Sequence, residues 1–293
     1  MIKLIFFGAG PYVIPIIETL RENFNLSLVV TTEKKPTDAV PSYCLRNKIP
    51  YITISSFSDP NWKLEIKNWK FDIAVLAYFG LILPKSILEL FPLGILNVHP
   101  SLLPKYRGPT PGQTAILNGD KETGVTIIKL DEEVDHGPIL AQTIKPIPPN
   151  YTTPQLYTEL FDDGAGLLAA HIDNYLKGKI KLEPQDHKKA TFTPTLTRGD
   201  GFIDLENPPS TEKLDRMIRA YYPWPGVWSR ISLRTDLKKS QKINTNEGPS
   251  LKSKSIIKFL PEKMIQVEGK KPMSYKDFIN GYPNAKLIFN LKF

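Results

Sequence analysis

Cysteine is almost absent from this chain of 293 residues, where Cys44 is the only one. A single thiol excludes an internal disulfide and a cysteine-based metal site, and it suits a reducing compartment. Long apolar runs are also missing, so we expect no membrane-spanning segment. The apolar run Ile2–Phe7 leads into a turn with no small-residue cleavage site, which is typical of a first strand and not of a signal peptide. We therefore expect a cytoplasmic protein with no bound metal.

The chain also lacks a complete dinucleotide-binding fingerprint. Gly8-Ala9-Gly10 follows the first predicted strand, as the first two glycines of such a motif would. Val13, however, stands where the third glycine belongs. We keep only the prediction of a strand, a turn and a helix.

Apolar strand-like runs alternate with helical patterns in the first part of the chain, which predicts an α/β fold with a doubly wound, mostly parallel sheet in residues 1–178. Residues 179–205 are polar without a clear period, and we interpret them as a linker. Short strand-like runs, turns and one helix in residues 206–293 predict a small β-barrel of the oligonucleotide-binding type. The predicted strands of the first domain are 2–7, 26–30, 51–54, 71–78, 95–99 and 125–130.

Positive charge is concentrated in the last third of the chain. Residues 1–205 carry 21 Lys and Arg against 22 Asp and Glu, whereas residues 206–293 carry 17 against 8, a net charge of +9. This excess is either a general bias towards lysine or a surface that binds a polyanion.

Polar side chains follow two buried strand-like runs in the middle of the chain. Asn97 and His99 end the run 95–99, and Asp135 follows the run 125–130. Because ligands bind beyond the carboxyl ends of strands in open α/β sheets, we expect the three side chains to meet in one crevice. An amide donor, an imidazole and a carboxylate suit attack on a carbonyl. Alternatively, His99 is a structural histidine and Asp135 belongs to a solvated acidic turn. The proline-bounded loop Pro100–Pro104 favours a functional site.

Several blocks of sequence resemble the formyltetrahydrofolate-dependent formyltransferases. In the first domain they are Asn97-Val98-His99-Pro100-Ser101-Leu102-Leu103-Pro104, Gly124-Val125-Thr126-Ile127 and Asp131-Glu132-Glu133-Val134-Asp135-His136-Gly137. In the second domain, Arg219-Ala220-Tyr221-Tyr222-Pro223-Trp224-Pro225 and Gly269-Lys270-Lys271-Pro272-Met273-Ser274 are similar to motifs of the members that act on methionyl-tRNA. The resemblance covers nearly the whole chain.

The resemblance implies a monomeric enzyme of translation initiation that transfers the formyl group of 10-formyltetrahydrofolate to the α-amino group of methionyl-initiator tRNA. It implies Asn97, His99 and Asp135 as catalytic residues. The implied folate contacts are Tyr78, Gly80, Leu81, Ser101, Leu102, Leu103, Pro104, Val134 and Gly137, and the implied substrate contacts are Lys34, Lys35, Arg107, Lys270 and Lys271. The loop Thr31–Val40, which carries Lys34 and Lys35, is shorter than is usual in these enzymes.

Other functions stay open from the sequence. Relatives with the same catalytic residues formylate glycinamide ribonucleotide or nucleotide-linked amino sugars, or hydrolyse the formyl-folate. A catalytically inactive RNA-binding protein is an alternative of another class. The basic second domain favours a tRNA substrate.

Overall fold

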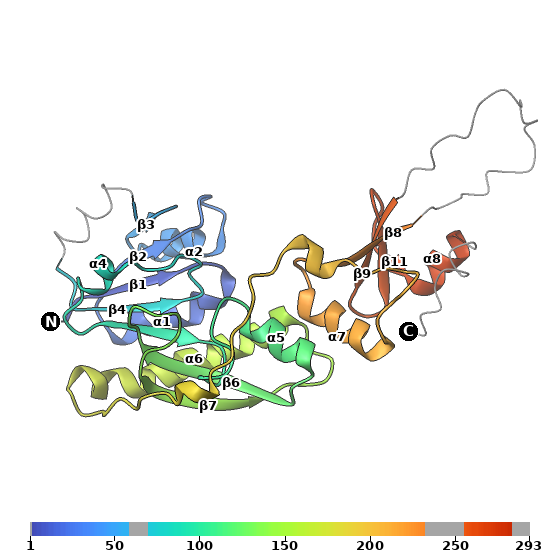
Figure 1. The fold of residues 1–293 in the computed structure, drawn as a ribbon. Helices are drawn as coiled ribbons and strands as arrows, with labels where there is room; N and C mark the ends of the chain where they lie inside the picture. Colours follow the sequence, from blue (N-terminus) through green and yellow to red (C-terminus); the bar gives the residue numbers. More distant parts are fainter. Residues whose placement is uncertain (1, 59–69, 232–254, 283–293) are drawn as a thin grey trace, which may run out of the picture. The chain divides into compact units, whose positions relative to one another are not determined.

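The computed structural model describes residues 2–58, 70–231 and 255–282. The chain forms two compact units, and the colours of Figure 1 follow the sequence through both. The first unit comprises Met1–Ala115, Asp120–Pro149 and Gln155–Thr195, and the second comprises Ile116–Gly119, Asn150–Pro154 and Leu196–Phe293.

A seven-stranded sheet in the order β3-β2-β1-β4-β5-β6-β7 forms the centre of the first unit. The neighbours from β3 to β5 pair in parallel, whereas β6 pairs antiparallel with both β5 and β7. The strands are β1 (Leu4–Gly8), β2 (Leu26–Thr31), β3 (Tyr51–Thr53), β4 (Ile73–Ala77), β5 (Ile95–His99), β6 (Glu122–Lys129) and β7 (Ile139–Pro146). The predicted doubly wound, mostly parallel sheet is confirmed, with an antiparallel edge.

The apolar sequence of the central strands explains their position. Every residue of β1 and of β5 is buried, as expected for strands that are covered on both faces. The helices that the described residues form here are α1 (Ile14–Asn23), α2 (Ala39–Asn47), α4 (Lys85–Leu88), α5 (Pro111–Asn118) and α6 (Thr153–Leu176), with a short 3₁₀ turn at Pro11–Val13. The end of α5 and the first two residues of α6 are assigned to the second unit. No helix in the described ranges is long and apolar enough to cross a membrane.

Helix α6 covers one face of β5, and the polar side chains of this strand lie on the other face. A Cβ atom on Gly164 of α6 would lie 2.7 Å from Cγ1 of Val98, so this glycine lets the helix pack closely on that face of β5. Because side chains alternate along a strand, Asn97 and His99 point to the opposite face. There they lie on the same side as Ile95, which belongs to a buried cluster with Phe7.

The segment that we predicted as a linker is divided between the two units. Residues up to Thr195 belong to the first unit, where Glu183 pairs with Ile139 at the start of β7. Further along, Phe192 pairs in parallel with Arg107, and the Arg107 N–H donates to the Thr191 carbonyl at 2.8 Å. Residues from Leu196 onwards belong to the second unit. The polar residues around 183–193 are thus fixed by backbone hydrogen bonds.

The second unit contains a four-stranded antiparallel sheet in the order β11-β10-β9-β8. Helix α7 (Thr211–Tyr221) begins after Ser210, whose side chain accepts a hydrogen bond from the Lys213 N–H, and buries Leu214 and Ile218. The other elements of this unit are β8 (Val227–Ile231), β9 (Ser255–Leu260), β10 (Met264–Val267), β11 (Met273–Ser274), α8 (Tyr275–Gly281) and a 3₁₀ turn at Arg198–Gly201. A further 3₁₀ turn, His187–Lys189, belongs to the first unit. Where we predicted a small β-barrel, the described residues form this four-stranded antiparallel sheet.

Candidate active site

Two polar side chains occupy the buried end of β5. Asn97 is 6% exposed and His99 is 5% exposed. The Nε2 atom of His99 lies 2.9 Å from the Tyr106 carbonyl oxygen. Because a carbonyl only accepts hydrogen bonds, we assign the proton to Nε2. The other ring nitrogen, Nδ1, faces Oδ2 of Asp135 at 3.5 Å.

The third predicted residue, Asp135, reaches β5 by a route that differs from the expected one. Strand β6 runs antiparallel to β5, so that Lys129 at its end lies beside Leu96 and not beyond His99. The following loop turns back along the sheet, and it passes so close to β6 that a Cβ on Gly137 would lie 1.8 Å from the Lys129 carbonyl oxygen. The three side chains therefore meet as predicted, but only two of them come from the carboxyl end of a strand.

The Asp135 carboxylate is held by two donors. Asn97 Nδ2 donates to Oδ1 at 3.1 Å, and the Gly108 N–H donates to Oδ2 at 2.8 Å. The Asn97 amide carries a second N–H that can donate to a bound oxygen. Asp135 thus lies between Asn97, which donates a hydrogen bond to it, and Nδ1 of His99.

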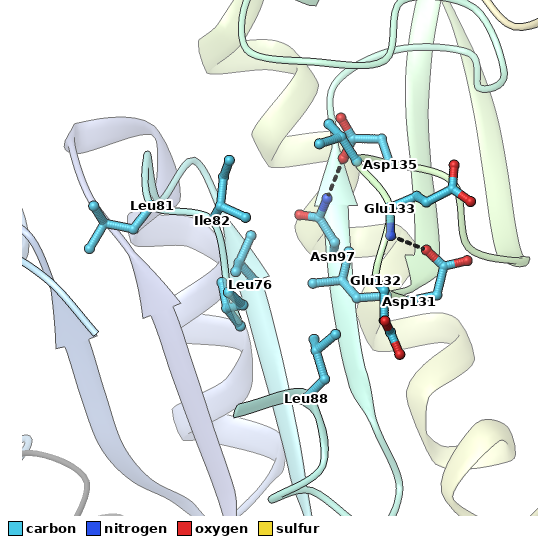
Figure 2. A pocket seen from close by; sticks show the side chains of 12 residues that line it. Leu76, Leu81, Ile82, Leu88, Asn97, Asp131, Glu132, Glu133 and Asp135 are labelled. Carbon is cyan, nitrogen blue, oxygen red and sulfur yellow. Dashed lines mark hydrogen bonds between the residues drawn. The ribbon is translucent and has the colours of Figure 1, made fainter. Parts of the chain in front are cut away.

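A pocket opens beside this group of side chains, and Figure 2 shows Asn97 and Asp135 pointing towards each other at its edge. The pocket has a volume of about 140 Å³ and is partly open to solvent. One wall is apolar and the other is acidic. The apolar residues are Leu76, Leu81, Ile82, Leu83, Leu88, Leu130 and Val134, and the acidic residues next to Asp135 are Asp131, Glu132 and Glu133.

The predicted folate contacts outside the loop Ser101–Pro104 fall into three groups. Leu81 and Val134 line the pocket, and Gly80 lies in the turn before Leu81 with a positive φ of 76°. Gly137 lies at the end of the Asp135 loop, against β6. The ring of Tyr78 packs instead against aromatic side chains, with centroid distances of 5.7 Å to both Tyr12 and Tyr157. Partial burial raises the pKa of the Tyr78 hydroxyl, while 42% of the residue stays exposed.

The loop Ser101–Pro104 packs against the antiparallel edge of the sheet. The hydroxyl of Thr126 donates to the Ser101 carbonyl at 2.6 Å, and its oxygen accepts from the Leu103 N–H at 3.1 Å. Gln142 Nε2 donates to the Leu103 carbonyl at 3.0 Å. The side chains of Ser101 and Leu103 are buried, while Leu102 and Pro104 are half-buried. This packing fixes the course of the chain directly after His99.

Among the predicted substrate contacts, Arg107 differs from the lysines. Arg107 is only 3% exposed, and its Nε and Nη2 atoms donate to Gln185 Oε1 at 3.2 and 2.7 Å. Such a guanidinium is a structural group of the site and is not placed to contact a large external substrate. Lys34 and Lys35 are exposed in the first unit, and Lys270 and Lys271 are exposed in the second.

Three further residues of the site could hardly be predicted from the sequence. Tyr106 and Gly108 act through backbone groups: the Tyr106 carbonyl faces His99, and the Gly108 N–H donates to Asp135. Gln185 donates from Nε2 to the carbonyls of Asp135 and Gly137, both at 2.8 Å. Gln185 lies in a polar stretch without periodicity, so only its position between buried partners reveals it.

Comparisons with known proteins agree with this architecture. A family model described as "Formyl transferase" matches residues 2–172, and one described as "Formyl transferase, C-terminal domain" matches residues 195–283. The methionyl-tRNA formyltransferase of Roseiflexus sp. (strain RS-1) is 37% identical, over 96% of this chain and 92% of that protein. That of Chloroflexus aggregans is 40% identical, over 78% of this chain and 76% of that protein. A solved 4-N formyltransferase from Francisella tularensis has a TM-score of 0.64 at 18% identity, covering 78% of this chain and 91% of that one.

The sheet, the buried polar residues at the end of β5 and the adjoining pocket define an enzyme that transfers one-carbon groups. Both family models and the relatives agree on one group of such enzymes. The chain belongs to the formyl transferase family.

Proposed function

We propose that this enzyme transfers the formyl group of 10-formyltetrahydrofolate to the α-amino group of methionyl-initiator tRNA. The observation that carries the chemistry is the group of Asn97, Asp135 and His99 beside a pocket that Asn97 and Asp135 line. The choice of substrate is supported by relatives named methionyl-tRNA formyltransferase along 96% of the chain and by the basic charge of residues 206–293.

The reaction replaces one carbon–nitrogen bond by another. The neutral amine attacks the formyl carbon, and the bond from that carbon to N10 of the folate then breaks. An α-amino group titrates near ~8, so that a useful fraction is already neutral in the cell. The protein must stabilise the oxyanion of the tetrahedral intermediate and move one proton from the amine to N10.

Asn97 is the proposed oxyanion donor. Its Nδ2 already donates one N–H to Asp135, which fixes the orientation of the amide. The second N–H is then held towards the pocket that Asn97 lines. A donor fixed in this way stabilises a developing oxyanion by roughly 3 kcal/mol.

His99 and Asp135 are the proposed groups for proton transfer. Because Nε2 of His99 is bound to the Tyr106 carbonyl, we assign the catalytic role to Nδ1. When Nδ1 is protonated it can donate to the formyl oxygen, and the Asp135 carboxylate at 3.5 Å stabilises the resulting positive charge. Asp135 also accepts the amine proton, which then passes to N10. This chemistry requires no metal.

The pocket is the proposed folate site. Its apolar wall of leucines suits a flat heteroaromatic ring, and the backbone of the loop that carries Val134 and Asp135 offers polar groups at the ring edge. Leu81 and Val134 line the pocket directly. Ser101–Pro104 and Gly137 shape the chain around it, so we retain them as part of the folate site.

The lysines that we propose as tRNA contacts lie on turns. Lys270 and Lys271 follow β10, and Lys34 and Lys35 follow β2, all of them exposed. Phosphate contacts by lysine position a nucleic acid without reading its sequence. We further propose that the protein acts as a monomer in the cytoplasm.

The test is formyl transfer to two acceptors under the same conditions. With 10-formyltetrahydrofolate as donor, the enzyme should convert methionyl-initiator tRNA to the formylated form. A nucleotide-linked amino sugar should not react at a comparable rate. Transfer to the sugar without transfer to tRNA would refute the proposed substrate and support the alternative from the same family.

A further inference from the structure

We propose that Gln185 is a positioning residue, which holds the backbone of the Asp135 loop so that the carboxylate stays directed at Asn97 and His99. This inference rests on the proposed function, because it assigns Gln185 a role in the same reaction. It also gives a role to the segment that the sequence predicts as a linker.

Gln185 uses both ends of its side-chain amide on buried partners. It is 5% exposed. Its Nε2 donates to the carbonyl oxygens of Asp135 and Gly137, both at 2.8 Å, and its Oε1 accepts from Arg107 Nη2 at 2.7 Å. The side chain therefore connects two backbone positions of the loop to a buried guanidinium.

The loop needs such support because its backbone conformation is uncommon. Asp135 has a φ of +49°, in the left-handed region that few residues other than glycine adopt readily. At its end, Gly137 lies against the Lys129 carbonyl. The carboxylate itself is bound by Asn97 and Gly108, so its direction depends on where the Asp135 backbone is held.

Arg107 fixes the amide of Gln185 in the orientation that this role requires. Two guanidinium donors on Oε1 leave the NH₂ group facing the loop. Arg107 Nη2 also lies 2.8 Å from His187 Nδ1, and the His187 ring stacks on His136 at 4.0 Å with an angle of 5° between the planes. His136 in turn lies 2.6 Å from Asp131, at the start of the same loop. The loop is thereby held at both of its ends by one network.

Replacement of Gln185 by glutamate tests the donor end of the side chain separately from its acceptor end. The variant Gln185→Glu keeps the size and the acceptor for Arg107, but loses the N–H groups that bind the two carbonyls. We expect kcat for formyl transfer to fall by roughly tenfold to a hundredfold, the scale of a small misplacement of a catalytic group. KM for the folate should change by less than about threefold, since Gln185 lies behind the loop and not in the pocket.

Two comparisons distinguish positioning from a general loss of structure. Gln113→Glu is the matched control, because Gln113 Oε1 accepts from the Tyr157 hydroxyl at 2.7 Å and glutamate keeps that acceptor. Its kcat should stay within about twofold of the unchanged enzyme. In an Asp135→Asn background, Gln185→Glu should lower kcat by less than about twofold, because residues that act through one another have non-additive effects.

Each outcome decides the inference. Normal kcat in Gln185→Glu would overturn it, and so would an equal loss with and without the Asp135 change. If Gln185→Glu does not fold, Gln185→Asn takes its place, since a shorter amide withdraws the same donors, and the same expectations apply. Failure of the unchanged enzyme to formylate methionyl-tRNA would refute the proposed function instead, which keeps the two claims separate.

Discussion

Substitution of Asp135 by asparagine tests the arrangement at the end of β5 with almost no change in side-chain size. The carboxylate accepts one hydrogen bond on each oxygen, from Asn97 Nδ2 at 3.1 Å and from the Gly108 N–H at 2.8 Å. An asparagine has one acceptor oxygen, so its NH₂ group must face one of these two donors. A lost hydrogen bond to a charged group costs about 1.5–3 kcal/mol, and we expect a decrease in stability of that order.

The effect of Asp135→Asn on turnover should be larger than its effect on stability. The variant removes the negative charge 3.5 Å from His99 Nδ1 and with it the acceptor for the amine proton. General acid–base groups contribute about 10²- to 10⁴-fold, so we expect kcat to fall by at least a hundredfold while folate binding changes little.

The assay is single-turnover formylation of methionyl-tRNA, with thermal unfolding measured on the same samples. Asp173→Asn is the control, because Asp173 is an exposed carboxylate on α6 that pairs with Lys177 at 3.6 Å. Such surface pairs contribute about 0–1 kcal/mol, so this variant should retain both stability and turnover. Turnover of Asp135→Asn within tenfold of the unchanged enzyme would refute the role of the carboxylate.

Three further predictions concern the rest of the molecule. If about four phosphate contacts are made, raising the salt concentration from ~50 to ~200 mM should weaken tRNA binding on the order of a hundredfold, measured by filter binding, and Lys270→Glu with Lys271→Glu should flatten that response. A salt-independent affinity would contradict this. Gly137→Ala should destabilise the protein by about 1–3 kcal/mol in chemical denaturation, because its Cβ would collide with a backbone oxygen, whereas Gly166→Ala in α6, with nothing within 4 Å, should not. Burial raises the pKa of the Cys44 thiol to about 11, so that its alkylation at pH 8 should be about a hundredfold slower in the folded protein than in urea, and equal rates would show the thiol to be accessible.

The sequence was sufficient for the parts of the fold that depend on hydrophobic pattern. Strands β1 and β4 are uninterrupted apolar runs, and β5 is apolar except for Asn97 and His99; such runs predict buried central strands. The grouping of Asn97, His99 and Asp135 could be anticipated because polar residues at the end of a buried strand have few structural reasons to be there.

The route by which the chain brings Asp135 to the site could not be predicted, because the composition of a strand does not show whether it pairs parallel or antiparallel. The inner residues of β6 are buried like those of the parallel strands, although β6 runs the opposite way. The segment with Gln185 and Thr191 was interpreted as a linker because it packs through hydrogen bonds, which produce no hydrophobic period. Arg107 was predicted as a substrate contact, and its pairing with the buried Gln185 could not be anticipated because the two residues are 78 positions apart.

The most direct measurement of the central claim is identification of the formylated product from a mixture. The enzyme is given 10-formyltetrahydrofolate labelled in the formyl carbon, together with methionyl-initiator tRNA and a nucleotide-linked amino sugar, and the products are analysed by mass spectrometry after mild base treatment. The account predicts that the label is released as N-formylmethionine, and that Asn97→Ala decreases this product by a hundredfold or more. Label found on the sugar, or only in free formate, would contradict it.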